Sequence, residues 1–270
     1  MSTKQRIISI AKGIGLALGA IICYLALSFA VLLLVQSCGL GGPVMSTLIA
    51  NSVFCALVLI VAVVQMNRDR PSLIDLPGAP SAARLDLRTV LLVLASFLIV
   101  WFVGQASGKW IIDLAPQDDF AKYQESIKSA SIPLILITTI VAAPVTEELL
   151  MRGVVYSRLR SVIPVWPAAL SSSMVFGLLH GTLVHMAYAV TLGVLLALIY
   201  ETTHRIWLPI ALHVGYNFLA FVPQGLTDAA SSLPWIVIGN IAVATVLLLL
   251  PRLLSPAKPG QQESAGIDQT

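Results

Sequence analysis

Charged residues are scarce in this sequence. Only 11% of its 270 residues are Asp, Glu, Lys or Arg, whereas soluble domains carry about 25%. The mean hydropathy is +0.90, which excludes a disordered chain. The 16 basic and 13 acidic residues leave a formal net charge of +3. That charge is too small to predict a nucleic acid or another polyanion as partner.

Cysteine is equally rare. The three residues of this type, Cys23, Cys38 and Cys55, lie in or beside apolar runs and include no CxxC pair. An odd number at these spacings argues against a disulfide-stapled secreted module and against a cysteine-based zinc framework. We therefore expect three inert thiols in apolar surroundings.

Long apolar runs fill most of the chain instead. A helix needs about 20 mostly apolar residues to cross a bilayer, because no backbone polar group can stay unpaired in hydrocarbon. The candidate runs are 13–35, 44–66, 89–108, one that begins near 132, 164–180, 183–200, 206–222 and 233–250. The predicted fold class is all-α, a polytopic membrane protein with about eight transmembrane helices and the lipid bilayer as its first partner.

The basic residues between these runs predict a topology. Thirteen fall in one alternate set of termini and loops, and only three (Lys109, Lys122 and Lys128) fall in the other set. The positive-inside rule then places both termini in the cytoplasm and agrees with eight spans. We interpret 1–254 as a single helical membrane domain, with 13–35 retained as a first helix rather than removed as a signal peptide. The polar residues 255–270 are expected to form a flexible tail.

Ionisable side chains in the second half of the chain need an explanation, because an unpaired charge inside a membrane is costly. Glu147 and Glu148 are adjacent, and Arg152 follows. On a helix, Glu148 and Arg152 are i and i+4, a spacing that permits an ion pair. Glu147 points about 100° away from Glu148. One carboxylate can thus be tied to the arginine while the other faces a cavity.

Two further helices carry polar side chains inside apolar runs. Phe176 and His180 are i and i+4 on one, and His213 and Asn217 have the same spacing on the other. Together with a glutamate they form a coherent hydrolytic set. A desolvated glutamate can act as general base towards water, and histidine and asparagine can donate hydrogen bonds to a developing oxyanion. The Glu/His/His set could also hold zinc, so a metal-bound and a metal-free water stay open as alternatives.

Three motifs carry a resemblance to a known family. In chain order they are Glu147-Glu148-x-x-x-Arg152, Phe176-x-x-x-His180 and His213-x-x-x-Asn217. Their order and helix placement are similar to those of the CPBP intramembrane proteases, also called the Abi family, which includes type II CAAX prenyl endopeptidases such as the Ras-converting endopeptidase. The core of the resemblance covers residues 144–217, somewhat over a quarter of the chain.

The resemblance implies a role for each motif residue. Glu147 would be the catalytic base, and His180 would position or activate the water. His213 and Asn217 would form the oxyanion or ligand pair. If a metal such as zinc is used, Glu147, His180 and His213 would be its ligands. The family has been described both as metalloproteases and as glutamate proteases, so the resemblance implies neither cofactor over the other.

The other motif residues would support this set: Glu148 and Arg152 as an ion pair, with Phe176 beside His180. The predicted function is an intramembrane endopeptidase that acts on a membrane-associated peptide or a lipidated protein, located in a bacterial inner membrane. Two hypotheses from other classes remain, an ion- or proton-coupled transporter and a catalytically silent scaffold or immunity protein. The oligomeric state is not predicted.

The sequence also predicts different depths for His180 and His213, and an exposed side chain for Glu201. Straight spans would put His213 about 12 Å from Arg205 and His180 about 24 Å from Pro164, at different depths. Tilt, a later helix start, or an interruption near Gly181 would reconcile the two histidines. Glu201 stands at a predicted helix end, where we expect it to be solvated.

Overall fold

The computed structural model describes residues 3–39, 43–66, 85–114, 132–220 and 230–254, with isolated positions at 118, 121 and 125. The described part of the chain is helical and contains no β-strand. Its elements, in order, are α1 (Thr3–Ser37), α2 (Pro43–Met66), α3 (Leu87–Leu114), α5 (Ile132–Ile135), η1 (Leu136–Ala142), α6 (Ala143–Glu148), η2 (Leu149–Tyr156), α7 (Ser157–Arg160), α8 (Val165–Leu178), α9 (Leu183–Thr203), α10 (Trp207–Leu219) and α11 (Leu233–Leu254). The predicted tail, 255–270, lies outside the described residues.

The prediction of a polytopic all-α membrane protein is confirmed, but the number of about eight spans is not supported. Each of the eight apolar runs contains a helix. Among the described residues, however, only five helices are long and apolar enough to cross a membrane: α1, α3, the continuous helix 132–160, α9 and α11. Helices α8 and α10 have 14 and 13 residues, or about 20 Å each. Helix α8 is shorter than its apolar run, 164–180, because residues 179 and 180 form a turn.

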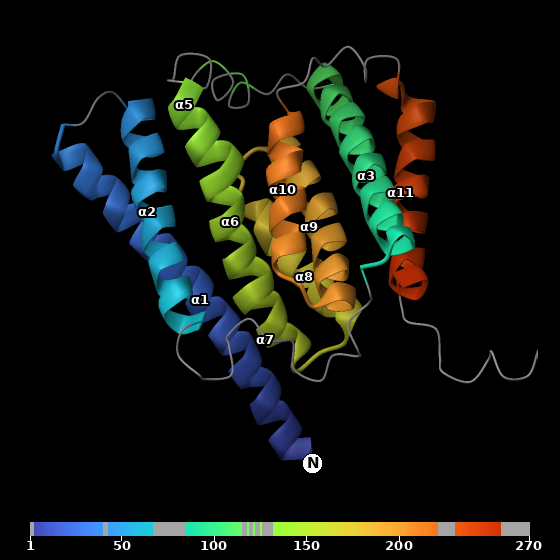
Figure 1. Cartoon of the computed structure of the whole chain (residues 1–270), viewed down its shortest axis with the longest axis horizontal. Coiled ribbons are helices and arrows are strands. Elements are labelled where there is room, and N and C mark those ends of the chain that lie inside the picture. Colours follow the sequence, from blue (N-terminus) through green and yellow to red (C-terminus); the bar gives the residue numbers. More distant parts are fainter. Residues whose placement is uncertain are drawn as a thin grey trace, which may run out of the picture.

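The segments from α5 to α7 form one continuous helix over residues 132–160, which we call the rod (Figure 1). Two π-helical stretches, η1 and η2, flank the short α6 that carries the glutamate pair. In η1 the hydrogen bonds reach five residues back, as from the Ala143 N–H to the Thr138 carbonyl. Pro144 follows and has no N–H to donate. Such π-helical turns inside α-helices often mark functional sites.

Helix α9 lies at the centre of the bundle and packs against α8, α3, α10 and α11 (Figure 1). It is apolar all round, as expected of a helix without a solvent face. Its residues 195–199 are fully buried. By contrast, large apolar side chains on α1, α3 and α11 are widely exposed, which suits contact with lipid. The N-terminal end of α1 and the C-terminal end of α11 lie at the same end of the bundle (Figure 1).

Glu201 is not solvated as its position at a helix end suggested. Only 4% of the residue is exposed, because its carboxylate joins α9 to the rod. Tyr156 Oη donates to Glu201 Oε2 at 2.8 Å, and Arg160 Nε donates to Glu201 Oε1 at 2.9 Å. The expectation was wrong because the interhelical partners of Glu201 are more than forty positions away in the sequence.

Candidate active site

The two adjacent glutamates occupy different environments at the end of α6. Glu148 is fully buried, and its Oε1 atom accepts hydrogen bonds from Arg152 Nη1 at 2.8 Å and from His213 Nδ1 at 2.9 Å. The Glu147 side chain is 25% exposed, and its Oε2 atom lies 3.7 Å from His213 Nε2. One carboxylate is therefore locked by donors, whereas the other keeps an open side.

Arg152 is the buried cation of the site. Only 1% of the residue is exposed, so its charge needs partners in place of water. Besides Glu148, the guanidinium donates from Nη2 to the carbonyl oxygen of Gly193 on α9 at 2.9 Å. Its central carbon lies 5.1 Å from the centroid of the Phe176 ring, a cation–π distance. Three helical segments thus meet at one guanidinium.

Gly193 allows this approach because it has no side chain. A Cβ atom at this position would lie 2.9 Å from Ser173 Cβ and Oγ and 3.3 Å from Arg152 Nη2. We expect Gly193→Ala to destabilise the folded state by about 1–3 kcal/mol, the usual cost of overpacking. The measurement is a thermal unfolding curve of the purified protein in detergent.

Two variants control this prediction. Gly19→Ala adds the same methyl group to α1, where no atom lies within 4 Å of the added carbon, and should leave the melting temperature unchanged. Ser173→Gly in the Gly193→Ala background removes the nearest clash and should recover part of the loss. Equal melting temperatures for Gly193→Ala and the parent would show that the α8–α9 contact can widen freely.

The Phe176 ring brings the two motif histidines together. Its centroid lies 4.6 Å from that of His180 and 5.7 Å from that of His213, both in edge-on geometry. Because both histidine rings contact the same phenylalanine, the two histidines lie at similar depth, and His180 lies in the turn after α8, which ends at Leu178. Gly181 follows with φ of +76°, a left-handed conformation that glycine adopts easily and that lets the chain reverse into α9.

The backbone fixes the tautomer of His180. Its Nδ1 atom lies 2.8 Å from the carbonyl oxygen of Phe176. A carbonyl can only accept, so Nδ1 carries the hydrogen and donates it. In the neutral ring, Nε2 then keeps its lone pair and can accept a hydrogen bond from a water molecule.

His213 lies between the two glutamates and is almost fully buried. Its Nδ1 atom is bonded to Glu148 Oε1, and its Nε2 atom faces Glu147 Oε2. When the ring is protonated, both nitrogens are donors and each faces a carboxylate. The resemblance implied an oxyanion or ligand role for His213; the structure adds that this histidine lies between Glu147 and Glu148 and contacts both.

Asn217 contacts the rod where its helical bonding is broken. Asn217 Nδ2 donates to the carbonyl oxygen of Thr139 at 2.8 Å. In the five-residue pattern of η1, that carbonyl would accept from the N–H of residue 144, which is proline and has none. The amide thus satisfies a carbonyl that Pro144 leaves free. One of its two N–H groups remains available for other contacts.

The side chains of the site do not fit a three-ligand metal centre. Among the residues that the structure describes, no three His, Cys, Asp or Glu side chains converge as they would around a metal ion. The set Glu147, His180 and His213 is therefore not gathered in ligating geometry. His180 Nδ1 is bonded to a backbone carbonyl, and both His213 nitrogens face carboxylates.

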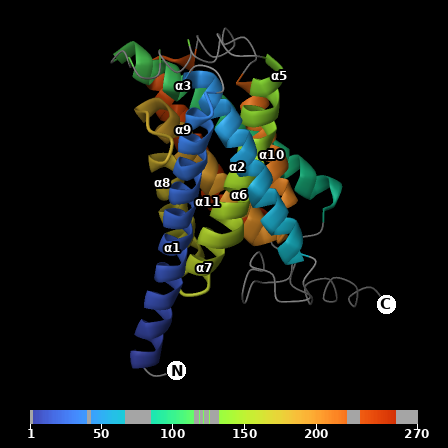
Figure 2. The ribbon, with the colours of Figure 1, turned by 90° about the vertical axis from the view of Figure 1, so that its left-hand side faces the viewer.

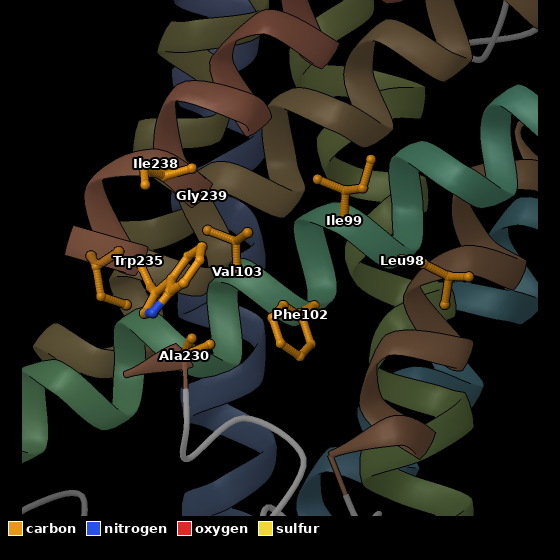
Figure 3. Close-up of a pocket in the computed structure, with 10 residues that line it drawn as sticks. Leu98, Ile99, Phe102, Val103, Ala230, Trp235, Ile238 and Gly239 are labelled. Carbon is orange, nitrogen blue, oxygen red and sulfur yellow. The ribbon is translucent and has the colours of Figure 1, made fainter. Parts of the chain in front are cut away.

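A separate apolar cavity lies between α3 and α11 (Figure 3). It has a volume of about 400 Å³, and Phe102, Val103 and Trp235 are among the residues that line it. None of the motif residues contributes to its lining. The polar motif residues are therefore concentrated around Phe176 and the glutamate pair, away from this cavity.

The roles of two backbone carbonyls, those of Thr139 and Gly193, and the burial of the Glu201 carboxylate were not predicted from the sequence. The carbonyls of Thr139 and Gly193 anchor Asn217 and Arg152, but no side-chain pattern marks a backbone acceptor. The interhelical contacts of Glu201 could have been predicted, because Arg152, Tyr156 and Arg160 repeat every four residues along one face of the rod. Such a polar stripe inside an apolar run indicates a polar partner on the neighbouring helix.

Comparison with known proteins agrees with the motifs. Residues 129–219 match a family model described as Type II CAAX prenyl endopeptidase Rce1-like. Over 94 residues the chain is 31% identical to the protein named "Putative membrane peptidase YdiL" of Bacillus subtilis (strain 168). That match covers 35% of this chain and 38% of the relative, so the chain spans less than half of the relative's length. No solved structure matches. The resemblance predicted from the three motifs is confirmed, and every motif residue lies within 129–219.

Proposed function

We propose, from the similarity of residues 129–219 to type II CAAX prenyl endopeptidases, that this integral membrane protein is an intramembrane endopeptidase. The observation that carries the proposal is the pair of unequal carboxylates at 147 and 148. Glu148 is neutralised by Arg152 and His213, while Glu147 has an open side and a histidine at its edge. A hydrolase that activates water needs one free carboxylate held in a fixed position.

In this mechanism Glu147 accepts a proton from a water molecule as the water oxygen attacks the scissile carbonyl carbon. The lone pair on His180 Nε2 accepts the second hydrogen of that water as a hydrogen bond and orients it. The remaining N–H of Asn217, with the Nε2–H of protonated His213, donates to the developing oxyanion. The intermediate then collapses, the C–N bond breaks, and the proton held by Glu147 passes to the departing amine.

The proposed subtype is a glutamate protease that activates water without a metal. It is supported by the spacing of the candidate ligands, since among the described residues no three His, Cys, Asp or Glu side chains converge on one point. We expect peptide hydrolysis to persist after exhaustive treatment of the purified protein with a zinc chelator. Loss of hydrolysis on chelation, followed by recovery on addition of Zn²⁺, would contradict the metal-free subtype.

The substrate class follows from the surroundings of the site. The motif residues lie on helices of an apolar bundle, which favours a substrate that is itself held at the membrane. We propose a membrane-associated peptide or a lipidated protein as substrate. The excess of basic residues in one alternate set of loops favours an orientation with both termini in the cytoplasm, in a bacterial inner membrane.

The test is peptide hydrolysis by the purified full chain reconstituted in liposomes, with a panel of membrane-anchored peptides. In H₂¹⁸O, each cleavage should place one ¹⁸O atom in the new carboxyl group, which mass spectrometry of the products detects. A parallel assay of ion and proton flux addresses the transporter hypothesis. Flux without cleavage of any anchored peptide would overturn the proposed function.

A further inference from the structure

Helices α1 and α2 form a hairpin that lies outside the region matched by the family, 129–219, yet covers one side of the rod (Figure 2). Ala17 and Ile21 of α1 share a buried cluster with Met151 and Val155 of η2. Helix α2 packs against η1 and α6. The hairpin therefore contacts the segment that carries the proposed base.

The packing of α1 on the rod sets which residues lie level with each other. A Cβ atom on Gly13 would lie 2.8 Å from Val162 Cγ2 and 3.1 Å from the Arg158 carbonyl oxygen, so α1 is in close contact with the end of the rod there. The helices run in opposite directions (Figure 1). Tyr24 is eleven residues beyond Gly13, and Glu147 is eleven residues before Arg158. At similar rises per residue, Tyr24 and Glu147 lie at the same level to within about one turn.

Side-chain contacts agree with this register. The Tyr24 ring packs edge-on against Phe54 of α2, with centroids 4.8 Å apart, and lies within electrostatic range of Glu147. On α2, the buried thiol of Cys55 is hydrogen-bonded to the Thr146 side chain and is also within range of Glu147. The Tyr24 hydroxyl and the Cys55 thiol of the hairpin thus lie on the side of α6 that carries Thr146 and Glu147.

The two donors assigned to the oxyanion, Asn217 Nδ2 and His213 Nε2, both come from α10, so a further donor would come from another helix. Of the hydrogen-bonding groups near Glu147, His213 Nδ1 is held by Glu148, and one N–H of Asn217 is held by the Thr139 carbonyl. His180 in its neutral form offers only a lone pair at Nε2. A phenol carries an O–H that can donate to a carbonyl oxygen in surroundings without bulk water.

We propose that Tyr24 is a further catalytic residue, whose hydroxyl donates a hydrogen bond to the scissile carbonyl oxygen as negative charge develops on it. The inference rests on the proposed function and extends the site to a helix outside the matched region. The hydroxyl forms no covalent bond and keeps its proton throughout. The Tyr24 ring contacts the Phe54 ring edge-on, with centroids 4.8 Å apart.

The test compares Tyr24→Phe with Phe54→Leu in the liposome cleavage assay. Tyr24→Phe keeps the ring and its contact with Phe54 but removes the donor. We expect kcat to fall on the order of 10²-fold, the effect of deleting one oxyanion donor, with KM changed less than about threefold and an unchanged melting temperature. Phe54→Leu disturbs the packing but keeps the hydroxyl, so it should lower the melting temperature and retain most of kcat.

Two results would overturn the inference. Tyr24→Phe with a kcat within twofold of the parent would remove the hydroxyl from the reaction while leaving the proposed function intact. If the parent itself cleaves no peptide, the proposed function fails, and the placement of Tyr24 is tested alone. In that case the pair Tyr24→Cys and Glu147→Cys, in a chain whose native cysteines are serine, should be joined by a short bismaleimide. Absence of this cross-link would overturn the placement as well.

Discussion

Glu147→Gln is expected to lower kcat for peptide hydrolysis by a factor on the order of 10² to 10⁴, the contribution of a positioned general base. Glutamine has the same shape as glutamate, and its carbonyl oxygen can accept a hydrogen bond from water. It cannot take the proton that the water must lose when it attacks. KM should change little, because the substitution removes an interaction made in the transition state.

The structure explains why this substitution should spare the fold. The Glu147 side chain is 25% exposed and has one neighbour at 3.7 Å, His213 Nε2, whereas Glu148 is fully buried between two donors. The thermal unfolding curve of Glu147→Gln should therefore match that of the parent. Asp113→Asn is the matched control, since it changes an exposed carboxylate on α3 that pairs with Lys109 and should retain full activity. Equal hydrolysis by Glu147→Gln and the parent would remove Glu147 from the role of base.

Arg152→Leu is expected to produce the largest loss of stability of any single substitution in the site. The change leaves the fully buried Glu148 without its guanidinium partner, and uncompensated buried charges cost about 3–5 kcal/mol. The Gly193 carbonyl loses its donor, and Phe176 loses the cation over its ring. The free energy of unfolding in detergent should fall accordingly, and hydrolysis should be lost together with the fold.

A double variant separates the charge from the packing in this prediction. Glu148→Gln with Arg152→Leu removes both charges, so the penalty of a lone buried carboxylate disappears. The double variant should be more stable than Arg152→Leu alone, although it should remain inactive because His213 loses its charged partner. If the double variant is less stable than either single one, the ion pair does not control the stability of this site.

The i and i+4 spacings in the sequence were sufficient to predict contacts within one helix. Glu148 and Arg152 pair at 2.8 Å, and Phe176 and His180 stack at 4.6 Å, because helix geometry places such residues on one face whatever surrounds them. The predicted difference between Glu147 and Glu148 has the same origin, since adjacent helical residues point about 100° apart.

Contacts between helices could not be predicted in this way. His213 reaches Glu148 across 65 positions, and Asn217 reaches Thr139 across 78. The acceptor of Asn217 exists because a π-helical turn precedes Pro144, and no spacing rule predicts such a turn. The oxyanion role assigned to His213 and Asn217 by resemblance remains a prediction, but the structure shows what else these two side chains bind.

The sequence by itself determined that this chain is helical, that it belongs in a membrane, and which residues form the three motifs. Those conclusions depend on composition and on periodicity, which act over a few residues. Only the tertiary structure decided the rest: five spanning helices rather than eight among the described residues, the buried position of Glu201, and the contact of His213 with Glu148. These features depend on where helices end and on how their side chains interlock, and in an apolar chain almost every helix face is hydrophobic enough to pack against any other.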